Sequence, residues 1–369
     1  MKIRGAVLEE IGRARPYRIS RPITISDLEL DDPGPGEVLV RIEAAGICHS
    51  DLSVVNGSRV RPVPMLLGHE AAGRVEKLGD GIVDLAVGQR VVMTFLPRCG
   101  TCPGCLTGGR LPCSVGSASN NTGVLMNGGV RLHRDGRDVA HHLGVSGFAT
   151  HAVVSRYSIV PVGDDIPADI AAVLGCAVLT GGGAVLNAGN PQPGDSIAIV
   201  GLGGVGMAAL ITAVGLGRGD VIGIDAVPAK LVKAKALGAR ATYSPQEALD
   251  AGIKASIVVE AAGNVRAFET AVAVTAPGGC TVTVGLPAPD ARSSIAPLGL
   301  VAEARSIVGS YMGSAVPSRD IPNYAQLWRD GVLPVDELIS RRVSLGDINE
   351  AMDELADGNA IRQVIMFGE

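Results

Sequence analysis

The chain has 369 residues and a mass of 37.6 kDa, which is long enough for two domains. Hydrophobic residues make up 47% and charged residues 19%, which excludes a disordered or low-complexity chain. The net charge is −5 and no basic run occurs, so we expect no nucleic-acid partner.

The N-terminus carries several charges and lacks the apolar core of a signal peptide, so we expect a cytoplasmic chain. Two uncharged stretches, 170–194 and 196–217, are long enough by count to cross a bilayer. The first contains two prolines and the second six glycines. We therefore expect both stretches to be buried α/β core and expect no membrane partner.

The predicted elements change character along the chain. Up to about residue 160, short apolar runs such as EVLVRIEAAG (37–46) are separated by Gly, Pro and Asp, which predicts an antiparallel β domain. From about 170, short Val/Ile runs alternate with helical patterns, which predicts the α/β class with a doubly wound parallel sheet. The tail after about 313 is too short for a stable core of its own. We expect it to pack back on the first domain, with ligands bound in a cleft between the two domains.

A glycine-rich turn follows the strand-like segment SIAIV. It comprises Gly201, Gly203, Gly204, Val205 and Gly206 and matches the dinucleotide-binding pattern. Gly203 would admit the pyrophosphate at a helix N-terminus, and Asp225 ends the next strand, where its carboxylate would accept hydrogen bonds from the ribose hydroxyls. This acid favours NAD over NADP. The alternative is a structural glycine turn with Asp225 as a strand-end cap. Lys230 either reaches the ribose or is a solvated helix charge.

Four of the seven cysteines lie in one Gly/Pro-rich loop, PRCGTCPGCLTGGRLPC. They are Cys99, Cys102, Cys105 and Cys113. Four thiolates at this spacing can complete a tetrahedral zinc shell with no open position, which predicts a structural zinc site. An iron–sulfur cluster could use the same ligands, but the hydride-carrier motif favours zinc. Two disulfides are the alternative, and a cytoplasmic location disfavours them.

Other metal-ligating side chains are far apart in the chain: Cys48 in GICHSDL, His69 and Glu70 in LLGHEAAG, and Cys176 in LGCAVLTGGG. No spacing rule links them, and each alone can be a buried thiol or a core histidine. We interpret Cys280 as a buried strand thiol.

These motifs, taken together in their order, resemble the zinc-dependent alcohol dehydrogenases of the medium-chain dehydrogenase/reductase superfamily. The resemblance covers nearly the whole chain. It implies a GroES-like, β-rich catalytic domain of residues 1–177 and 313–369 and a Rossmann NAD-binding domain of residues 178–312. It also implies two Zn²⁺ per chain and NAD. Residues 114–150 resemble the longer, dimeric branch of the family, which predicts a homodimer joined through the Rossmann sheet edge near CTVTVGL (280–286).

The resemblance assigns metal-site roles residue by residue. Cys48, His69 and Cys176 would bind the catalytic zinc, with water or the substrate oxygen at the fourth position. Glu70 would lie behind the metal and ligate it transiently. Asp51 would fix the tautomer of His69.

The resemblance also implies the hydride and proton paths. Ser50 would hydrogen-bond the alcohol and pass its proton on, while a hydride moves to the nicotinamide. His49 would contact the pyrophosphate, Thr180 the nicotinamide and Arg362 the phosphates. The chain departs from many relatives at Ser53, where they carry a histidine as the proton outlet. His49, a ribose hydroxyl or water could replace that outlet.

Phe95, Leu143, Leu286 and Tyr311 are similar to pocket-lining positions of the family. They imply a mostly apolar slot for primary or secondary, apolar or aryl alcohols. One alternative is a formaldehyde dehydrogenase of the same superfamily that acts on a glutathione or mycothiol adduct. An alternative of another class is a non-catalytic, zinc-stabilised scaffold that senses NAD(H) and holds one zinc instead of two.

Overall fold

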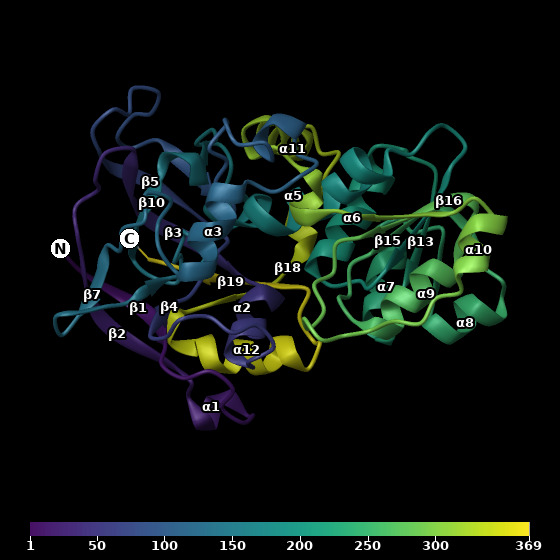
Figure 1. The fold of residues 1–369 in the computed structure, drawn as a ribbon, viewed down its shortest axis with the longest axis horizontal. Helices are drawn as coiled ribbons and strands as arrows, with labels where there is room; N and C mark the ends of the chain where they lie inside the picture. The colour runs from purple at the N-terminus through teal and green to yellow at the C-terminus, as the bar shows by residue number, and fades with distance from the viewer. Residues whose placement is uncertain (369) are drawn as a thin grey trace. The chain divides into compact units, whose positions relative to one another are not determined.

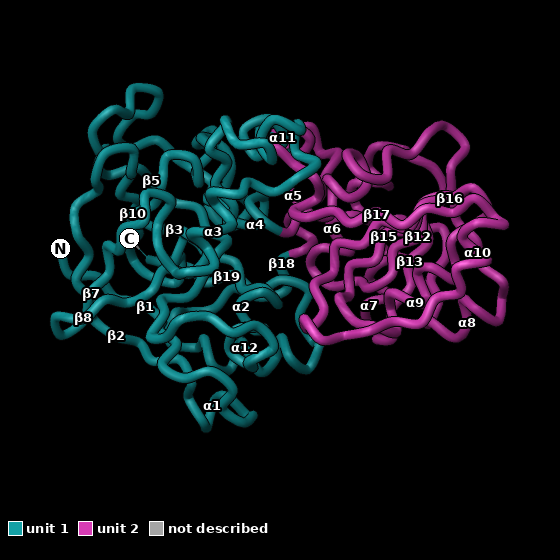
Figure 2. The backbone as a smooth tube through the Cα atoms, viewed as in Figure 1, with its two compact units in different colours: residues 1–176, 317–325, 339–369 teal, residues 177–316, 326–338 magenta. Residues whose placement is uncertain are grey.

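A computed structural model describes residues 1–368, and Figure 1 shows its ribbon. The chain forms two compact units, coloured separately in Figure 2. Unit 1 comprises Met1–Cys176, Pro317–Ala325 and Ile339–Glu369, and unit 2 comprises Ala177–Val316 and Gln326–Leu338.

Unit 1 is built on two β-sheets, as the short apolar runs predict. The strands of the first sheet are β1 (Lys2–Leu8), β2 (Ile23–Leu30), β4 (Met65–Leu66), β7 (Leu132–Arg134), β8 (Arg137–Asp138) and β9 (Ala140–His141). Those of the second are β3 (Glu37–Ile47), β5 (Ala71–Leu78), β6 (Arg90–Met93), β10 (His151–Ser155), β11 (Ile159–Pro161), β18 (Ile339–Val343) and β19 (Arg362–Met366). All pairs are antiparallel except β4 with β9 and β18 with β19. The tail returns to this unit, because β19 pairs with β3.

The helices of unit 1 are short. They are α1 (Tyr17–Ser20), α2 (His49–Val55), η1 (Cys105–Thr107), α3 (Ser114–Thr122), η2 (Arg156–Ser158), α4 (Ala168–Val173), η7 (Leu345–Asp347) and α12 (Ile348–Ala356). Helix α12 buries one apolar stripe, formed by Ile348, Ala351, Met352 and Leu355, against the core of unit 1. This spacing of three and four residues is what an amphipathic helix requires.

Unit 2 contains a six-stranded sheet in which all neighbouring strands are parallel. Its order is β14-β13-β12-β15-β16-β17, with β12 (Ser196–Val200), β13 (Asp220–Ile224), β14 (Ala241–Tyr243), β15 (Ala255–Glu260), β16 (Thr275–Thr283) and β17 (Ser306–Gly309). The helical segments of this part of the chain are α5 (Leu179–Gly183), η4 (Ala184–Gly189), α6 (Gly204–Gly215), α7 (Pro228–Ala236), α8 (Pro245–Asp250), α9 (Val265–Ala273), α10 (Pro297–Ala302), η5 (Tyr311–Ser314) and η6 (Val335–Leu338). With β12 as the first strand, this order is that of the Rossmann fold.

One helical stretch, Ala168–Gly189, is apolar and long enough by composition to cross a membrane. It consists of α4, the π-helix η3 (Leu174–Val178), α5 and the π-helix η4. Because 94% of its most apolar window is buried inside the protein, it is a core helix. This confirms the prediction of buried core for residues 170–185, whereas 186–194 are mostly exposed or half-buried.

The C-terminal part of the chain is shared by the two units, whereas the sequence assigned all of 313–369 to the first domain. Helix α11 (Pro317–Arg329) begins in unit 1, and Gln326–Leu338 belongs to unit 2. The reason is close packing: a Cβ at Gly215 of α6 would overlap the carbonyl oxygen of Val332, and Lys233 of α7 pairs with Glu337.

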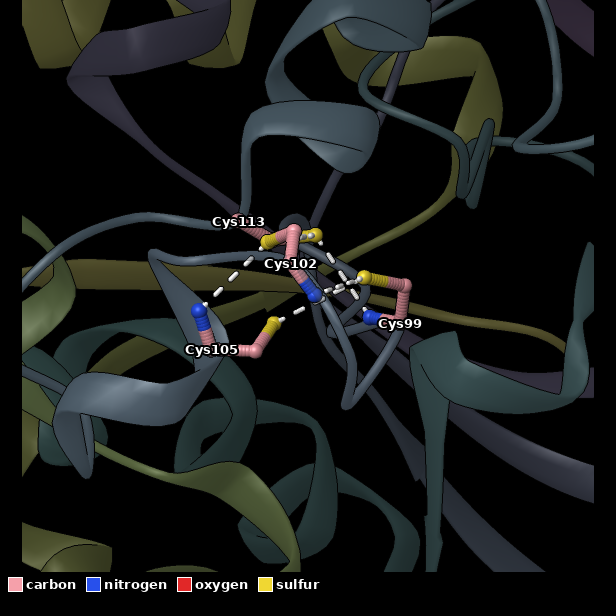
Figure 3. A group of neighbouring side chains, drawn as sticks. All are labelled: Cys99, Cys102, Cys105 and Cys113. Atoms are coloured by element: carbon pink, nitrogen blue, oxygen red, sulfur yellow. Dashed lines mark hydrogen bonds between the residues drawn. The ribbon is translucent and has the colours of Figure 1, made fainter.

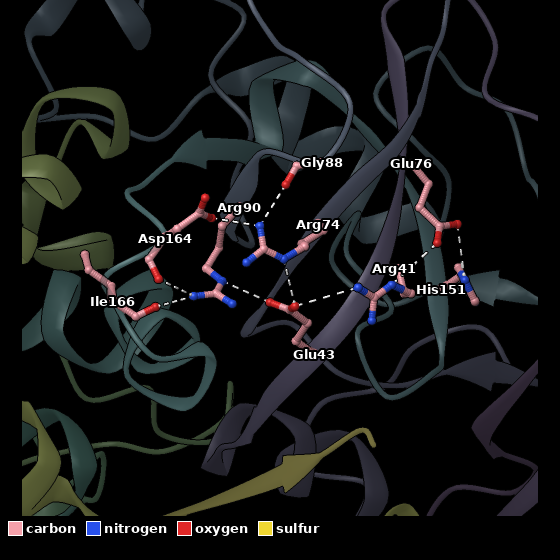
Figure 4. A network of polar contacts seen from close by, with 9 residues as sticks. All are labelled: Arg41, Glu43, Arg74, Glu76, Gly88, Arg90, His151, Asp164 and Ile166. Atoms are coloured by element: carbon pink, nitrogen blue, oxygen red, sulfur yellow. Dashed lines mark hydrogen bonds and ion pairs between the residues drawn. The ribbon is translucent and has the colours of Figure 1, made fainter. Parts of the chain in front are cut away.

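An ion-pair network ties the second sheet of unit 1 to the start of α4 (Figure 4). Glu43 of β3 accepts from Nε of Arg74 at 3.1 Å and from Nε of Arg90 at 3.0 Å. Nη1 of Arg90 donates to the carbonyl oxygens of Asp164 (3.1 Å) and Ile166 (2.6 Å), just before α4 begins. The network therefore anchors the helix that leads to Cys176.

Candidate metal and nucleotide sites

Three segments of unit 1 bring the distant metal-ligating residues together. Cys48 follows β3 and is the N-cap residue of α2. His69 and Glu70 lie between β4 and β5, and Cys176 lies in the π-helix η3, a geometry often found at functional sites. All four side chains are buried, and one ligand atom from each lies within 4.8 Å of those of the others. The structure thus brings these four residues together, although no spacing rule in the sequence links them.

Each of the three segments contains a glycine at a point of close approach. A Cβ at Gly46 would overlap the carboxylate of Glu70, and one at Gly175 would overlap the carbonyl oxygen of Met93. Gly68 has a φ of +93°, and a Cβ there would lie 2.5 Å from the backbone nitrogen of Phe148. Glycine is required at these positions because a side chain would displace the adjacent ligand.

The carboxylate of Asp51 orients His69. Nδ1 of His69 lies 2.9 Å from Oδ1 of Asp51, and Oδ2 of Asp51 accepts from the backbone N–H of Cys48 at 3.1 Å. Burial opposes ionisation of Asp51, but the charge of His69 and contacts with His142 and His69 lower its pKa to about 2. With Nδ1 engaged, Nε2 of His69 faces Cys176, 3.5 Å from its Sγ. This is the arrangement expected of a metal-bound imidazole.

Glu70 and Arg362 form a buried pair at the same cluster. Nη1 of Arg362 lies 3.5 Å from Oε2 of Glu70 and donates to the carbonyl oxygen of Ile47 at 3.0 Å. Among residues 1–368 neither carboxylate oxygen of Glu70 accepts a hydrogen bond. Burial, opposed by the charge of Arg362, raises the pKa of Glu70 to about 7. The pKa of Cys48 lies well below its usual value. The main cause is a hydrogen bond with Cys176; burial opposes this shift, and the charge of Arg362 adds to it.

The four-cysteine loop folds into a second cluster (Figure 3). Sγ of Cys99 lies 3.9 Å from Sγ of Cys105, and the Sγ atoms of Cys102 and Cys113 are also 3.9 Å apart. Backbone N–H groups point at the sulfurs, for example from Cys102 to Cys99 at 3.3 Å. Hydrogen bonds from Ser114 and from the backbone of Cys105 lower the pKa of Cys102 to about 5.

Both clusters fit zinc. Sulfurs bound at 2.3 Å to a tetrahedral zinc lie about 3.8 Å apart, close to the spacing in the four-cysteine loop. That spacing excludes disulfides, and all seven cysteines are free thiols. The cluster of Cys48, His69 and Cys176 offers three soft or borderline donors, the number that a catalytic zinc uses while keeping one position open.

The glycine turn of unit 2 has the geometry of a nucleotide site. Gly201 has a φ of +91°, and a Cβ on Gly206 would overlap the carbonyl oxygen of Gly201, so α6 packs tightly on β12. A Cβ on Gly203 would meet no atom of residues 1–368 within 4 Å, which leaves room for a ligand at the start of α6. Asp225 accepts from the backbone N–H of Leu202 at 2.6 Å and of Val227 at 2.8 Å.

The remaining predicted residues are spread over both units. His49 is exposed and Ser50 half-buried at the start of α2, and the hydroxyl of Ser53 donates to the carbonyl oxygen of His49 at 2.7 Å. Thr180 is buried in α5, and Lys230 is half-buried in α7. Their contacts with a cofactor stay predictions.

Cys280 differs from its prediction. It lies in β16, as a strand residue, but is partly exposed instead of buried. The physical reason is its place next to the short outer strand β17, whose burial is low.

The predicted pocket residues fall in two groups. Phe95 and Leu143 of unit 1 are buried, and the ring of Phe95 packs edge-on against His69 with centroids 5.6 Å apart. Leu286 and Tyr311 of unit 2 are more exposed, at 45% and 37%. An apolar ring thus borders the metal cluster of unit 1.

His142 is a functional candidate that sequence reasoning missed. It is 1% exposed, and its Nδ1 lies 3.1 Å from Oδ1 of Asp51. The signal in the sequence was a pair of adjacent histidines, His141 and His142, in an otherwise apolar stretch.

Comparisons with known proteins agree with this geometry. Residues 34–164 match the family "Alcohol dehydrogenase GroES-like domain", and residues 204–329 match "Zinc-binding dehydrogenase". A geraniol dehydrogenase from Castellaniella defragrans is 36% identical over 98% of this chain and 97% of its own. An S-(hydroxymethyl)glutathione dehydrogenase from Synechocystis is 32% identical over 100% of both chains. The crystal structure of benzyl alcohol dehydrogenase from Acinetobacter calcoaceticus has a TM-score of 0.91 at 28% identity and covers both chains fully.

The chain belongs to the zinc-dependent alcohol dehydrogenases of the medium-chain dehydrogenase/reductase superfamily. It is an oxidoreductase that acts on small-molecule alcohols, built from a GroES-like unit and a Rossmann unit. The predicted fold class and family are confirmed.

Proposed function

We propose that the protein oxidises apolar or aryl primary and secondary alcohols by hydride transfer to NAD, and reduces the corresponding aldehydes and ketones in the reverse direction. The observation that carries the proposal is the buried convergence of Cys48, His69 and Cys176 in unit 1. Zinc held by these three residues would polarise the alcohol oxygen and lower its pKa. Glu70 would act from behind the metal, and Cys99, Cys102, Cys105 and Cys113 would hold the structural zinc.

The protein residues move the proton. Ser50, half-buried beside Cys48, would accept the alcohol proton through its hydroxyl. The hydroxyl proton of Ser53 is engaged with the carbonyl oxygen of His49, so Ser53 is a poor onward relay. We propose His49, exposed at the start of α2, as the outlet to solvent.

The choice of NAD rests on Asp225. Its carboxylate is held at the end of β13 by two backbone N–H groups, where it would accept from the ribose hydroxyls and repel a 2′-phosphate. Gly203 leaves room for the pyrophosphate, and Lys230, Thr180, His49 and Arg362 are proposed as further contacts.

The substrate class rests on the apolar ring of Phe95, which packs against His69, and on the predicted pocket position of Leu143, which is also buried. The relatives named for geraniol and benzyl alcohol act on apolar or aryl alcohols, which supports the same class here. A hydrophobic slot separates substrates by only about 1 to 3 kcal/mol per methylene, so several alcohols should be turned over.

The alternative activity is oxidation of a thiol adduct of formaldehyde, which the relative named for S-(hydroxymethyl)glutathione favours. The test is a panel of benzyl alcohol, geraniol and hexanol with NAD or NADP, beside formaldehyde with glutathione or mycothiol. Turnover of the free alcohols with NAD supports the proposal. Turnover of formaldehyde only with added thiol would overturn it in favour of the alternative.

Metal analysis separates the enzyme from a non-catalytic NAD(H)-sensing scaffold. The enzyme requires two zinc ions per chain, one in each cluster. One zinc per chain, bound by the four-cysteine loop, with no turnover of any alcohol would support the scaffold.

We also propose a homodimer joined at β17. The predicted interface is the sheet edge near 280–286, and β17, which pairs with residues 280–283 of β16, is the outer strand at that edge. Apolar side chains gather near this edge: Leu298 is 77% exposed, Val301 80% and Val308 39%. An exposed strand edge with apolar neighbours favours pairing with a second copy. We also propose a cytoplasmic location, because both zinc clusters need reduced cysteines, the state that the cytosol maintains.

A further inference from the structure

We propose that His142 is a positioning residue of the catalytic metal centre, acting through Asp51 on the ligand His69. The inference rests on the proposed zinc site. Nδ1 of His142 and Nδ1 of His69 approach the same oxygen of Asp51, at 3.1 and 2.9 Å. The two imidazoles are perpendicular, with their centroids 5.6 Å apart.

The topology explains why these two histidines meet. Strand β4 leads through Leu67 and Gly68 to His69, and strand β9 leads directly to His142. These strands are parallel neighbours, with Leu66 opposite His141. Because parallel strands end at the same edge of a sheet, the residues that follow them are brought side by side.

The buried carboxylate needs more than one partner. The side chain of Asp51 is 0% exposed. Burying a carboxylate ion that has a single partner costs free energy of folding, because the lost hydration is not replaced. His69 faces Oδ1 and the backbone N–H of Cys48 faces Oδ2. His142 adds a close contact, with its Nδ1 3.1 Å from Oδ1 but outside hydrogen-bond geometry, and this contact comes from a residue that is not one of the proposed zinc ligands. Without His142, only His69 and the backbone N–H of Cys48 would restrain rotation of the Asp51 carboxylate. Both belong to proposed zinc ligands, which are the residues that Asp51 has to orient.

His142 is itself held firmly. Its backbone N–H donates to the hydroxyl of Ser146 at 3.0 Å. The loop that follows contains two non-glycine residues at positive φ, Leu143 and Ser146, both at 52°. Such backbone strain persists where the surrounding structure fixes the chain, and it is concentrated at functional sites. A rigid loop makes His142 a defined anchor for Asp51.

The test compares His142→Leu and His142→Asn, whose new side chains are similar in shape to each other, with His141→Leu as the matched control. Asparagine places an N–H donor near the position of Nδ1, and leucine has none. His141 is equally buried at 1% exposure, but its Nε2 accepts from the backbone N–H of Arg131 and it is not a member of the Asp51 cluster. The readouts are zinc content, the rate of zinc release to a chromophoric chelator, the visible spectrum of the cobalt-substituted holoenzyme, and kcat and KM separately.

We expect His142→Leu to release the catalytic zinc about tenfold faster or more, to change the cobalt spectrum and to lower kcat about 10- to 100-fold, with little change in the KM for NAD. His142→Asn should restore most of these losses. His141→Leu should release the catalytic zinc within about twofold of the wild-type rate.

Three results would overturn the proposal: wild-type zinc release in His142→Leu, no rescue by asparagine, or the same release rate in His141→Leu. If His142→Leu does not fold, His142→Gln replaces it, because its amide reaches the Nε2 position instead of Nδ1 and should not rescue. Two zinc ions in the wild type with no effect of His142 variants would overturn this inference alone. One zinc ion in the wild type would overturn the proposed catalytic site as well.

Discussion

Cys48 serves both the metal cluster and the start of a helix. Its thiol lies in the buried ligand group, and its backbone N–H binds the carboxylate that orients His69. Replacement of the side chain therefore removes a ligand while leaving the backbone contact in place.

We expect Cys48→Ala to bind one zinc ion per chain instead of two and to lose at least about a thousandfold in kcat, because two residues alone would hold the metal that lowers the pKa of the alcohol when bound. NAD affinity should stay within about twofold. Metal analysis, steady-state kinetics and fluorescence titration with NADH measure the three quantities. The control is Cys280→Ala, a thiol outside both clusters, which should keep two zinc ions. Full turnover of Cys48→Ala would contradict the metal assignment.

Asp225 offers a second residue-level prediction, for cofactor choice. Asparagine removes the negative charge but retains an oxygen that can accept from Leu202 or Val227. We expect the ratio of kcat/KM for NADP to that for NAD to rise about tenfold or more, because repulsion of the 2′-phosphate is lost. Asp250→Asn, on α8, is the control of equal charge change. An unchanged ratio would count against a role at the ribose.

Some residues could be assigned from local pattern and others could not. The glycine turn and the four-cysteine loop are local motifs, so their spacing predicts their geometry. Cys48, His69 and Cys176 have no fixed spacing, and only the resemblance to a known family linked them before the structure did. His142 escaped notice because its partner, Asp51, is contributed by a different segment of the fold.

At the scale of elements, helix α12 is joined to the segment around α1 by one buried carboxylate. Asp353 accepts from the backbone N–H groups of Tyr17 (2.9 Å) and Arg18 (3.0 Å) and from Nε of Arg15 (3.2 Å). Burial alone would raise the pKa of Asp353, but these three donors outweigh burial and lower it. The side chain replaces missing partners at the start of a very short helix.

We expect Asp353→Asn to lower the free energy of unfolding by about 2 kcal/mol, because hydrogen bonds to a charged group are lost. Asp357→Asn removes the exposed partner of the same Arg15 and should cost less than about 0.5 kcal/mol. Urea unfolding of both variants measures the difference. Similar losses in both would contradict the importance of burial.

The pH dependence has a defined sign. Because folding lowers the pKa of Asp353, its stabilising effect is complete above its unfolded pKa of about 3.9 and is lost as the pH falls through the lower folded value. The gap in stability between wild type and Asp353→Asn should therefore be constant near neutral pH and shrink in acid. A gap that widens in acid would contradict this account.

The alternation of strands and helices after residue 170 could be predicted from periodicity, and β12 has the predicted bounds of 196–200. The π-helical turn that carries Cys176 could not, because a π-turn differs from an α-helix by hydrogen bonding and not by apolar spacing. The position of β17 as the outer strand also depends on tertiary pairing, since four residues of low burial give a weak pattern.

At the scale of the whole molecule, the proposed dimer depends on the edge of the unit 2 sheet. A lysine at position 308 would place like charges near each other across a twofold axis. We expect Val308→Lys to weaken the dimer at least about tenfold, equivalent to about 1.4 kcal/mol, as measured by sedimentation at several concentrations. Val83→Lys, at a site in unit 1 that is 94% exposed, should leave the association unchanged. Equal behaviour of the two variants would place the interface elsewhere.

Strand β19 is flanked by β3 and β18 in the second sheet of unit 1, yet it is encoded after the whole of unit 2. A ribosome therefore delivers every residue of the nucleotide-binding unit before it delivers the strand that completes the catalytic unit, including Arg362 beside Glu70. Nascent chains should consequently contain every strand of the Rossmann sheet before they contain β19, so the second sheet of the catalytic unit gains this inner strand last.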